Sequence, residues 1–111
     1  MAREISFSWW ETILWILKYR RWFVVSGESM KPTLSPDQYV LVDLNPPSIQ
    51  EDDVVVCTHP ETELPMIKRV VIIEHGRFFV QGDNQEESTD SRQFGWLTKE
   101  HILGLVVSIL A

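Results

Sequence analysis

The chain has 111 residues, 44% of them hydrophobic, and a formal net charge of −6 at pH 7. This length supports one small domain with a modest core. The acidic charge argues against nucleic acid as a partner, because phosphate binding needs a basic face, and a single cysteine, Cys57, excludes an internal disulfide.

The N-terminal segment is apolar and rich in tryptophan. Ser8 and Glu11 have the spacing of a capping box that opens a helix. The apolar run Ile5–Leu17 is shorter than the ~20 residues that span a bilayer. Basic residues follow this run instead of preceding it, unlike in a cleavable signal peptide. We therefore predict an N-terminal helix over residues 1–22 that either contacts the membrane surface through residues 5–22 or covers the core of its own β-domain.

Residues 23–111 have the pattern of short strands separated by turns. Their regular spacing predicts a mainly β domain in which consecutive antiparallel strands close into a small barrel. A helical turn is expected near Leu97–His101, and Gly82–Gly95 has the composition of a loop. The predicted strands are Trp22–Val25, Tyr39–Leu44, Asp53–Thr58, Met66–Glu74, Arg77–Gln81 and Gly104–Leu110.

Three segments carry candidate site residues, and the first is Ser26–Leu34, which reads SGESMKPTL. It contains Ser29 in a segment that Pro32 and Pro36 keep from forming a long helix. A serine hydroxyl becomes a nucleophile when a nearby base takes its proton. The simpler interpretation is a loop serine that caps a turn.

The second segment, MIKRVV, holds Lys68 next to Arg69. Adjacent residues of a strand point to opposite faces, so one of these two charges faces inward. Burial disfavours the ammonium form and would make Lys68 a usable base, and the like charge of Arg69 would add to this effect if it lies close enough. The simpler interpretation is an alternating strand with Lys68 in water.

The third segment, GDNQEESTDSRQFG from Gly82 to Gly95, is polar enough to be an ordinary surface loop. Together and in this order, the three segments resemble the signal peptidase I superfamily of serine/lysine peptidases. The resemblance covers roughly Val24 to Val106. It implies a serine endopeptidase with Ser29 as the nucleophile and Lys68 as the general base. It also implies an oxyanion hole at the backbone N–H of Ser29 with help from Gly27, which has no hydroxyl to contribute.

The same resemblance implies roles for the residues around this pair. Ser88 is expected to orient the lysine through a hydrogen bond. Asp90 and Arg92 are expected to form an ion pair that fixes the loop, and Asp83 to hold a structural turn. We expect Met30 to pack beside the nucleophile and line the substrate pocket. The Tyr39–Leu44 strand is a second candidate lining, because an extended substrate can pair with an exposed strand edge.

The chain is most similar to the nickel-type superoxide dismutase maturation protease within this superfamily. It lacks the inserted domain of many bacterial members and the Gly-x-Pro-Gly-Asp turn after the Lys-Arg pair, and it has His59-Pro60 after a valine run. That enzyme removes an N-terminal propeptide. The resemblance therefore implies a protein precursor as substrate and a cytoplasmic location, peripheral at the membrane if residues 5–22 bind lipid.

Three alternatives stay open at this point. A compact signal peptidase I would cleave exported preproteins. A LexA-like regulator would cleave itself, although the N-terminal residues are too few and too apolar for a helix-turn-helix. A catalytically silent interaction module is disfavoured by the intact Ser/Lys pair. The histidines and Cys57 have no metal-ligand spacing, so we expect neither a metal nor a cofactor.

Overall fold

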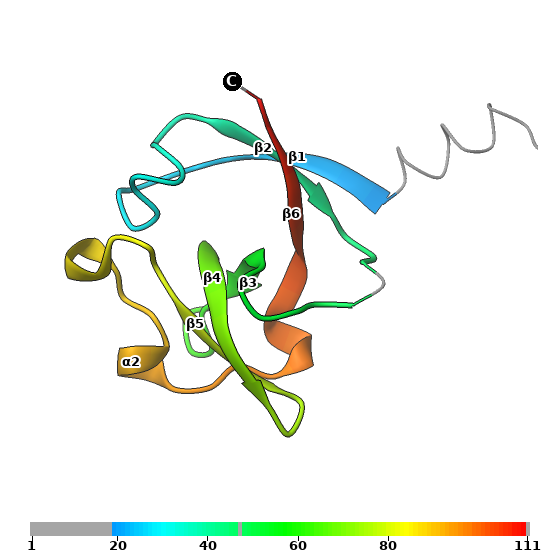
Figure 1. Ribbon diagram of the computed structural model, residues 1–111, viewed down its shortest axis with the longest axis vertical. Coiled ribbons are helices and arrows are strands. Elements are labelled where there is room, and N and C mark those ends of the chain that lie inside the picture. Colours follow the sequence, from blue (N-terminus) through cyan, green and yellow to red (C-terminus); the bar gives the residue numbers. More distant parts are fainter. Residues whose placement is uncertain (1–18, 47, 111) are drawn as a thin grey trace, which may run out of the picture.

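The computed structural model describes residues 19–46 and 48–110. Six strands dominate this part of the chain, so the prediction of a mainly β fold is confirmed (Figure 1). The strands are β1 (Arg20–Val24), β2 (Tyr39–Asp43), β3 (Val54–Thr58), β4 (Pro65–Glu74), β5 (Arg77–Gln81) and β6 (Ile102–Leu110). Three short helices complete the fold: η1 (Gln85–Glu87), α2 (Ser91–Phe94) and η2 (Lys99–His101). No helix of the described residues is long and apolar enough to cross a membrane.

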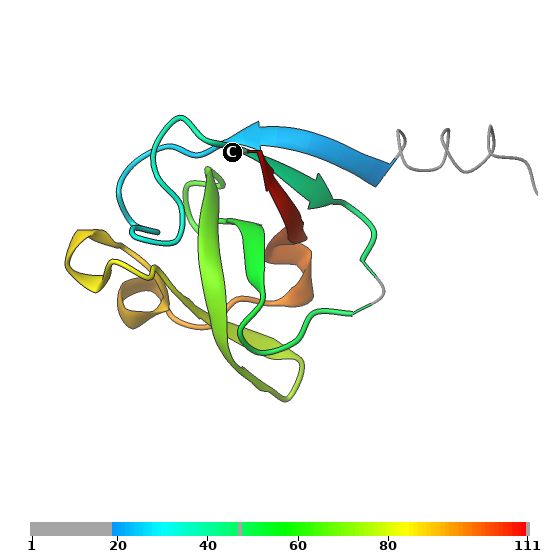
Figure 2. The same ribbon diagram turned by 45° about the horizontal axis from the view of Figure 1, so that its top comes forward.

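The strands form one antiparallel sheet in the order β1-β2-β6-β3-β4-β5. The expected barrel of consecutive strands was wrong, because β6 inserts between β2 and β3 and the sheet is not closed between β1 and β5. The ladder shifts register within the β2–β6, β3–β6 and β4–β5 pairs. Such bulges increase bending and twist, and Figure 2 shows the long strand β4, in light green, curving towards its hairpin with β5.

The first strand begins at Arg20, two residues before its predicted start. Arg20 and Trp22 pair with Asp43 and Leu41 of β2. The end of the expected helix over residues 1–22 is therefore part of the sheet. The rest of that helix, residues 1–18, lies outside the described residues.

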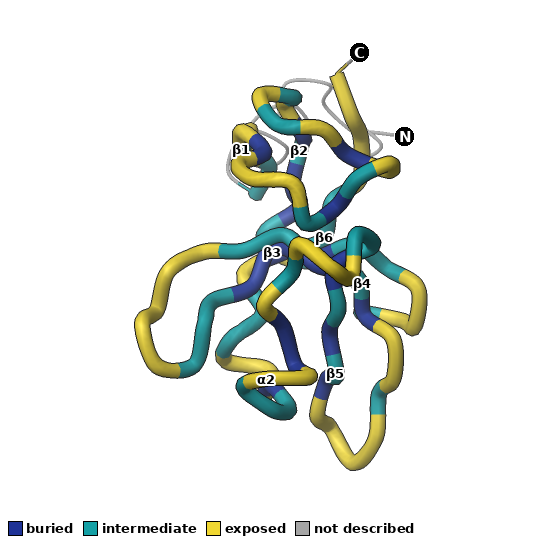
Figure 3. The backbone as a smooth tube through the Cα atoms, turned by 90° about the vertical axis from the view of Figure 1, so that its left-hand side faces the viewer, coloured by how far each residue is buried: buried dark blue, intermediate teal, exposed yellow. Residues whose placement is uncertain are grey.

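The curved sheet encloses two hydrophobic clusters, because neighbouring valines of β3 point to opposite faces. Val56 belongs to one cluster, with Val25, Met30, Leu34, Val40 and Val42. Val55 belongs to the other, with Cys57, Val70, Phe78, Val80 and Leu97. Figure 3 shows these buried stretches along the middle of the molecule, with exposed turns at its ends. The candidate site lies where the loop after β1 meets β4 and the segment after β5.

Candidate active site

The loop that carries Ser29 is fastened to the first cluster by two of its own side chains. Met30 and Leu34 are each only 1% exposed, and the Leu34 N–H donates to the Met30 carbonyl at 2.9 Å. Gly27 has a φ of +80°, a conformation that favours glycine. Ser29 itself is half-buried. The loop thus presents Ser29 from a rigid base.

The segment after β5 clamps this loop from the other side. The Asn84 N–H donates to the Ser29 carbonyl at 2.7 Å, and its side-chain amide donates to the Glu28 carbonyl at 3.1 Å. The Ser29 N–H donates no backbone hydrogen bond within the described residues. The carbonyl of Ser29 is therefore held, while its N–H is left available. Sequence analysis assigned no role to Asn84.

Gly82 lies between the two candidate serines. A Cβ on Gly82 would collide with the Ser88 hydroxyl and lie 2.6 Å from the Ser29 carbonyl oxygen. Only glycine allows the loop of Ser29 and the segment of Ser88 to pack this closely. This contact brings the first and third sequence segments together.

Lys68 faces inward from β4. Alternation along the strand required either Lys68 or Arg69 to face inward, and the buried residue is Lys68. It is 4% exposed, and its Nζ donates to Ser88 Oγ at 2.9 Å. Burial lowers the pKa of Lys68 below its usual 10.5; the carboxylate of Asp90 opposes this shift, and the guanidinium of Arg92 adds to it. We had expected Arg69 to supply the like charge, but Arg92 does so.

Arg69 points to the other face and holds Asp83 in a two-point ion pair. Arg69 Nε and Nη2 each lie 2.8 Å from one Asp83 oxygen, and the Thr33 hydroxyl also donates to Asp83. These bonds lower the pKa of Asp83, with Arg69 contributing most. Asp83 thus ties β4 to the loop of Ser29, a longer-range link than the turn expected from sequence.

Asp90 is the centre of a buried hydrogen-bond network and is fully buried. It accepts from Ser88 Oγ at 2.7 Å and from the Gly82 N–H at 3.0 Å. Arg92 donates to it through Nε at 2.9 Å and Nη2 at 3.0 Å. Burial alone would raise the pKa of Asp90, but these bonds outweigh burial and lower it from 3.8 to about 2. Asp90 is therefore ionised at neutral pH.

The helix α2 keeps Asp90 and Arg92 in register. Asp90 is its N-cap, and it forms a capping box with Gln93. Ser91 Oγ accepts from the N–H of Val80 at 2.8 Å, which fixes the helix to β5. Sequence analysis had this region as loop and missed both Ser91 and Gln93. The S-x-D-S-R-Q spacing, with a carboxylate followed three residues later by Gln, was the available signal.

Cys57 lies near Lys68 but is not a nucleophile. Burial raises the pKa of the Cys57 thiol to about 12, so it is uncharged at neutral pH. It is a core residue of the second cluster. Among the described residues, no group of three or more His, Cys, Asp or Glu side chains could hold a metal ion.

Comparison with known proteins identifies the family. A model of the Peptidase S24-like family matches residues 5–107. The chain belongs to this family. It is also similar to mitochondrial inner membrane protease subunit 2 of Saccharomyces cerevisiae, with 26% identity over 115 residues that cover 78% of this chain. The match covers 65% of that longer protein.

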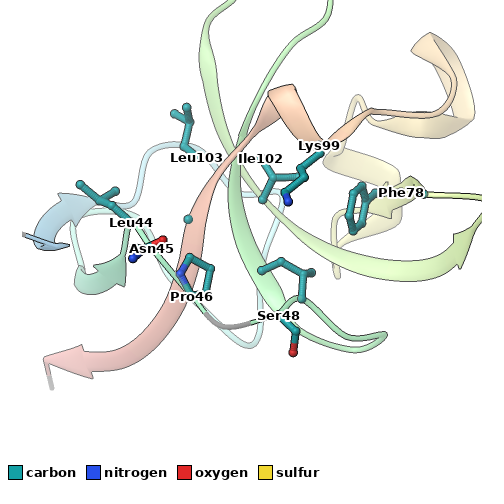
Figure 4. A pocket seen from close by; sticks show the side chains of 11 residues that line it. Leu44, Asn45, Pro46, Ser48, Phe78, Lys99, Ile102 and Leu103 are labelled. Atoms are coloured by element: carbon teal, nitrogen blue, oxygen red, sulfur yellow. The ribbon is translucent and has the colours of Figure 1, made fainter.

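Two cavities of this S24-like peptidase differ in their relation to Ser29. A cavity of about 150 Å³ lies between the end of β1 and the start of β4, and its lining includes Ser26, Val24 and Met66. A larger cavity of about 480 Å³ is lined by Leu44, Phe78 and Lys99, among others (Figure 4). None of the catalytic and supporting residues predicted from sequence lines either cavity. The lining of the smaller cavity includes Ser26, three residues before Ser29, and Ile67, directly before Lys68, so position favours the smaller cavity as a substrate groove.

Two expectations about this groove need correction. Met30 is buried in the core beneath the loop rather than open to a ligand. The Tyr39–Asp43 strand has no free edge, because it pairs with both β1 and β6. The groove instead borders a free edge on the first part of β4. Residues Pro65–Lys68 pair with β3 on one side only, since β5 pairs with β4 from Arg69 onward.

Proposed function

We propose that this S24-like peptidase is a serine endopeptidase in which Ser29 is the nucleophile and Lys68 the general base. The observation that carries the proposal is the buried contact of Lys68 Nζ with Ser88 Oγ, 2.9 Å long. Gly82 packs against that hydroxyl and against the Ser29 backbone. A buried lysine with a lowered pKa can activate a serine hydroxyl without histidine, and Gly82 brings the segment that holds this lysine against the loop of Ser29.

The direction of the Ser88 hydrogen bonds favours catalysis. A serine hydroxyl has one proton, and Ser88 donates it to the ionised Asp90. Ser88 therefore accepts from Lys68 and offers no proton to the amine. The lone pair of neutral Lys68 remains free for the Ser29 proton. Ser88 and Asp90 act as positioning residues, because they hold the base without touching the substrate.

The chemistry then follows in two steps. Ser29 Oγ attacks the scissile carbonyl carbon while Lys68 takes the hydroxyl proton, and the negative oxygen of the tetrahedral intermediate is stabilised by the free N–H of Ser29 together with the backbone at Gly27. The C–N bond breaks as Lys68 returns the proton to the leaving amine. Water, deprotonated by Lys68, then hydrolyses the acyl-enzyme and regenerates Ser29.

The substrate is proposed to bind as an extended strand along the free edge of Pro65–Lys68. The main chain of β4 would supply hydrogen bonds, and the groove lined by Ser26, Val24 and Met66 would receive side chains before the scissile bond. A groove of about 150 Å³ holds small side chains. We therefore expect Ala or another small residue just before the cut.

We further propose that the substrate is the precursor of a nickel superoxide dismutase, cleaved in the cytoplasm to release its N-terminal propeptide. The catalytic domain begins with β1 at Arg20 rather than at residue 23, and residues 5–22 contact the membrane surface peripherally. Support comes from the resemblance of the three sequence segments and the His59-Pro60 pair. The similarity to an inner membrane protease subunit favours a second candidate, cleavage of exported preproteins.

Incubation of the purified chain with each precursor class separates these functions. Mass spectrometry of the products should show a new N-terminus of the mature dismutase with the parent protein and none with Ser29→Ala. Cleavage of exported preproteins alone would overturn the maturation role while keeping the dyad. Cleavage only within the chain's own sequence would favour the self-cleaving alternative.

A further inference from the structure

The cavity of about 480 Å³ lies where β6 changes its strand partner. β6 pairs with β2 from Leu105 to Leu110 and with β3 between Ile102 and Leu105. After Asp43 the chain leaves the β6 ladder and continues as the connection to β3, which forms the facing wall of the cavity. One edge of Ile102–Gly104 therefore has no strand beside it within the described residues, and these three residues line the cavity.

The walls of this cavity belong to both halves of the core. Leu44 packs against the first hydrophobic cluster, whereas Ile49 and Ile102 pack against the second cluster, to which Phe78 belongs. Leu103 adds to the apolar lining and is 39% exposed. The volume falls within the range of small-molecule sites, about 300–1,000 Å³. Apolar walls of this kind favour a hydrocarbon group as the occupant.

Among the described residues that line the cavity, Lys99 alone is charged. Figure 4 shows its side chain reaching from η2 into the space that Ile102 and Phe78 also line. The ammonium group has no carboxylate partner within the part of the chain that the structure describes. The protein has a net charge of −6, so a cavity with a single positive group differs from the rest of the molecule. That charge is complementary to an anionic ligand.

We propose that this cavity binds a small carboxylate with an unbranched apolar chain. The hydrocarbon would pack between Leu44 and Phe78, and the carboxylate would accept a hydrogen bond from the exposed Lys99 Nζ. Asn45 and Ser48 also line the cavity and would supply further donors. The end of a polypeptide fits less well, because its amide groups would need partners that the apolar walls do not offer.

Titration of the full-length chain with octanoate, followed by protein NMR, tests this site. The test needs no cleavage, since neither Ser29 nor Lys68 lines the cavity. Octanoate should shift the backbone amide signals of Leu44 and of Ile102–Gly104. It should bind about tenfold more tightly than octylamine, which has the same chain and the opposite charge. Each CH₂ added between butanoate and octanoate should tighten binding about fourfold.

Lys99→Gln should weaken octanoate binding about tenfold, because the charge-assisted hydrogen bond is lost. Lys99→Arg should retain most of the affinity, since the positive charge remains. Lys31→Gln is the matched control. The Lys31 side chain is 44% exposed but pairs with Glu28 on the loop of Ser29, and it does not line the cavity. This control should bind octanoate like the parent.

The absence of shifts around the cavity on addition of octanoate would remove the site. Equal affinity for octanoate and octylamine would contradict recognition of a carboxylate. Unchanged octanoate binding by Lys99→Gln would show that Lys99 does not hold the ligand. Shifts confined to residues 1–18 would assign octanoate to the N-terminal segment and would also overturn the proposal.

Discussion

Ser88 Oγ lies 2.7 Å from Asp90 Oδ2 and donates its only proton to that carboxylate. This bond fixes the role of Ser88 towards Lys68. Because the Ser88 hydroxyl donates its proton to Asp90, it can only accept a hydrogen bond from the lysine. The carboxylate stays charged, since its pKa is lowered to about 2. Asp90 therefore acts on Lys68 in two ways: it orients the Ser88 hydroxyl, and its negative charge raises the pKa of the lysine.

Asp90→Asn and Arg92→Gln should shift the pH dependence of cleavage in opposite directions. The rate rises with pH as Lys68 loses its proton. The charge of Asp90 raises the pKa of Lys68 and that of Arg92 lowers it. The rise should therefore move to lower pH in Asp90→Asn and to higher pH in Arg92→Gln. Profiles of kcat/KM against pH measure both, and shifts of the same sign would contradict the arrangement.

Asp90→Asn should also lower the plateau rate about 10- to 100-fold. An Asn side chain can donate to Ser88, which frees the Ser88 proton to occupy the lone pair of Lys68. Ser88→Ala removes both the hydroxyl proton that competes for the Lys68 lone pair and the hydrogen bond that positions Lys68. A plateau in Asp90→Asn equal to that of the parent would show that the direction of the Ser88 bond is irrelevant.

Gly82→Ala should abolish cleavage almost completely and destabilise the fold by about 1–3 kcal/mol. The new Cβ collides with the Ser88 hydroxyl and the Ser29 backbone, and displacement of reacting groups by ~1 Å costs about 100-fold in rate. Gly76→Ala is the matched control. Gly76 has a positive φ, so an alanine there is strained, but open space surrounds its Cβ position. It should lose stability and keep activity; equal activity of the two variants would contradict the close packing at Gly82.

Lys68→Met should abolish cleavage without lowering the free energy of unfolding at neutral pH. The fold keeps Lys68 dry, and its pKa below 10.5 shows that burial opposes the charged form. An apolar side chain of similar length removes that cost. Chemical denaturation measures the change. A loss of several kcal/mol would mean that Lys68 is mainly structural.

The ionised Asp90 should make the fold sensitive to acid. Its pKa is 3.8 as the ordinary value and about 2 in the fold, so the folded state favours the carboxylate. This contribution, about 2 kcal/mol, is present above pH 3.8 and is lost as the pH falls to about 2. The stability difference between the parent and Asp90→Asn should shrink over that interval. A constant difference would argue against an ionised Asp90.

Local patterns in the sequence predicted the strands well, because each alternates or runs apolar between strong turn formers. Closure of the sheet could not be predicted, since the insertion of β6 between β2 and β3 depends on contacts between distant segments. The same limit explains why the strand predicted to bind substrate was wrong. Tyr39–Asp43 has no free edge, because β6 pairs with it on the side away from β1. The local sequence predicts which residues form a strand, but it does not predict which strands pair beside it.

The site divides in the same way. Alternation along β4 required one of Lys68 and Arg69 to face inward, and the resemblance indicated Lys68. The bond from Lys68 to Ser88 agrees with that resemblance. The clamp of Asn84 on Ser29 and the packing of Gly82 were missed, because nothing in a polar segment shows which distant backbone it contacts. The four-residue helix α2 was missed because its residues are also turn formers.

The proposed dyad is tested most directly by comparing Ser29→Ala, Lys68→Met and the double variant on one peptide library, with products identified by mass spectrometry. Residues that act as one unit give non-additive losses. We predict that the parent cuts after small residues and that all three variants fall to the same residual rate. Cleavage retained by Ser29→Ala or Lys68→Met, or losses that multiply in the double variant, would contradict a Ser29/Lys68 mechanism.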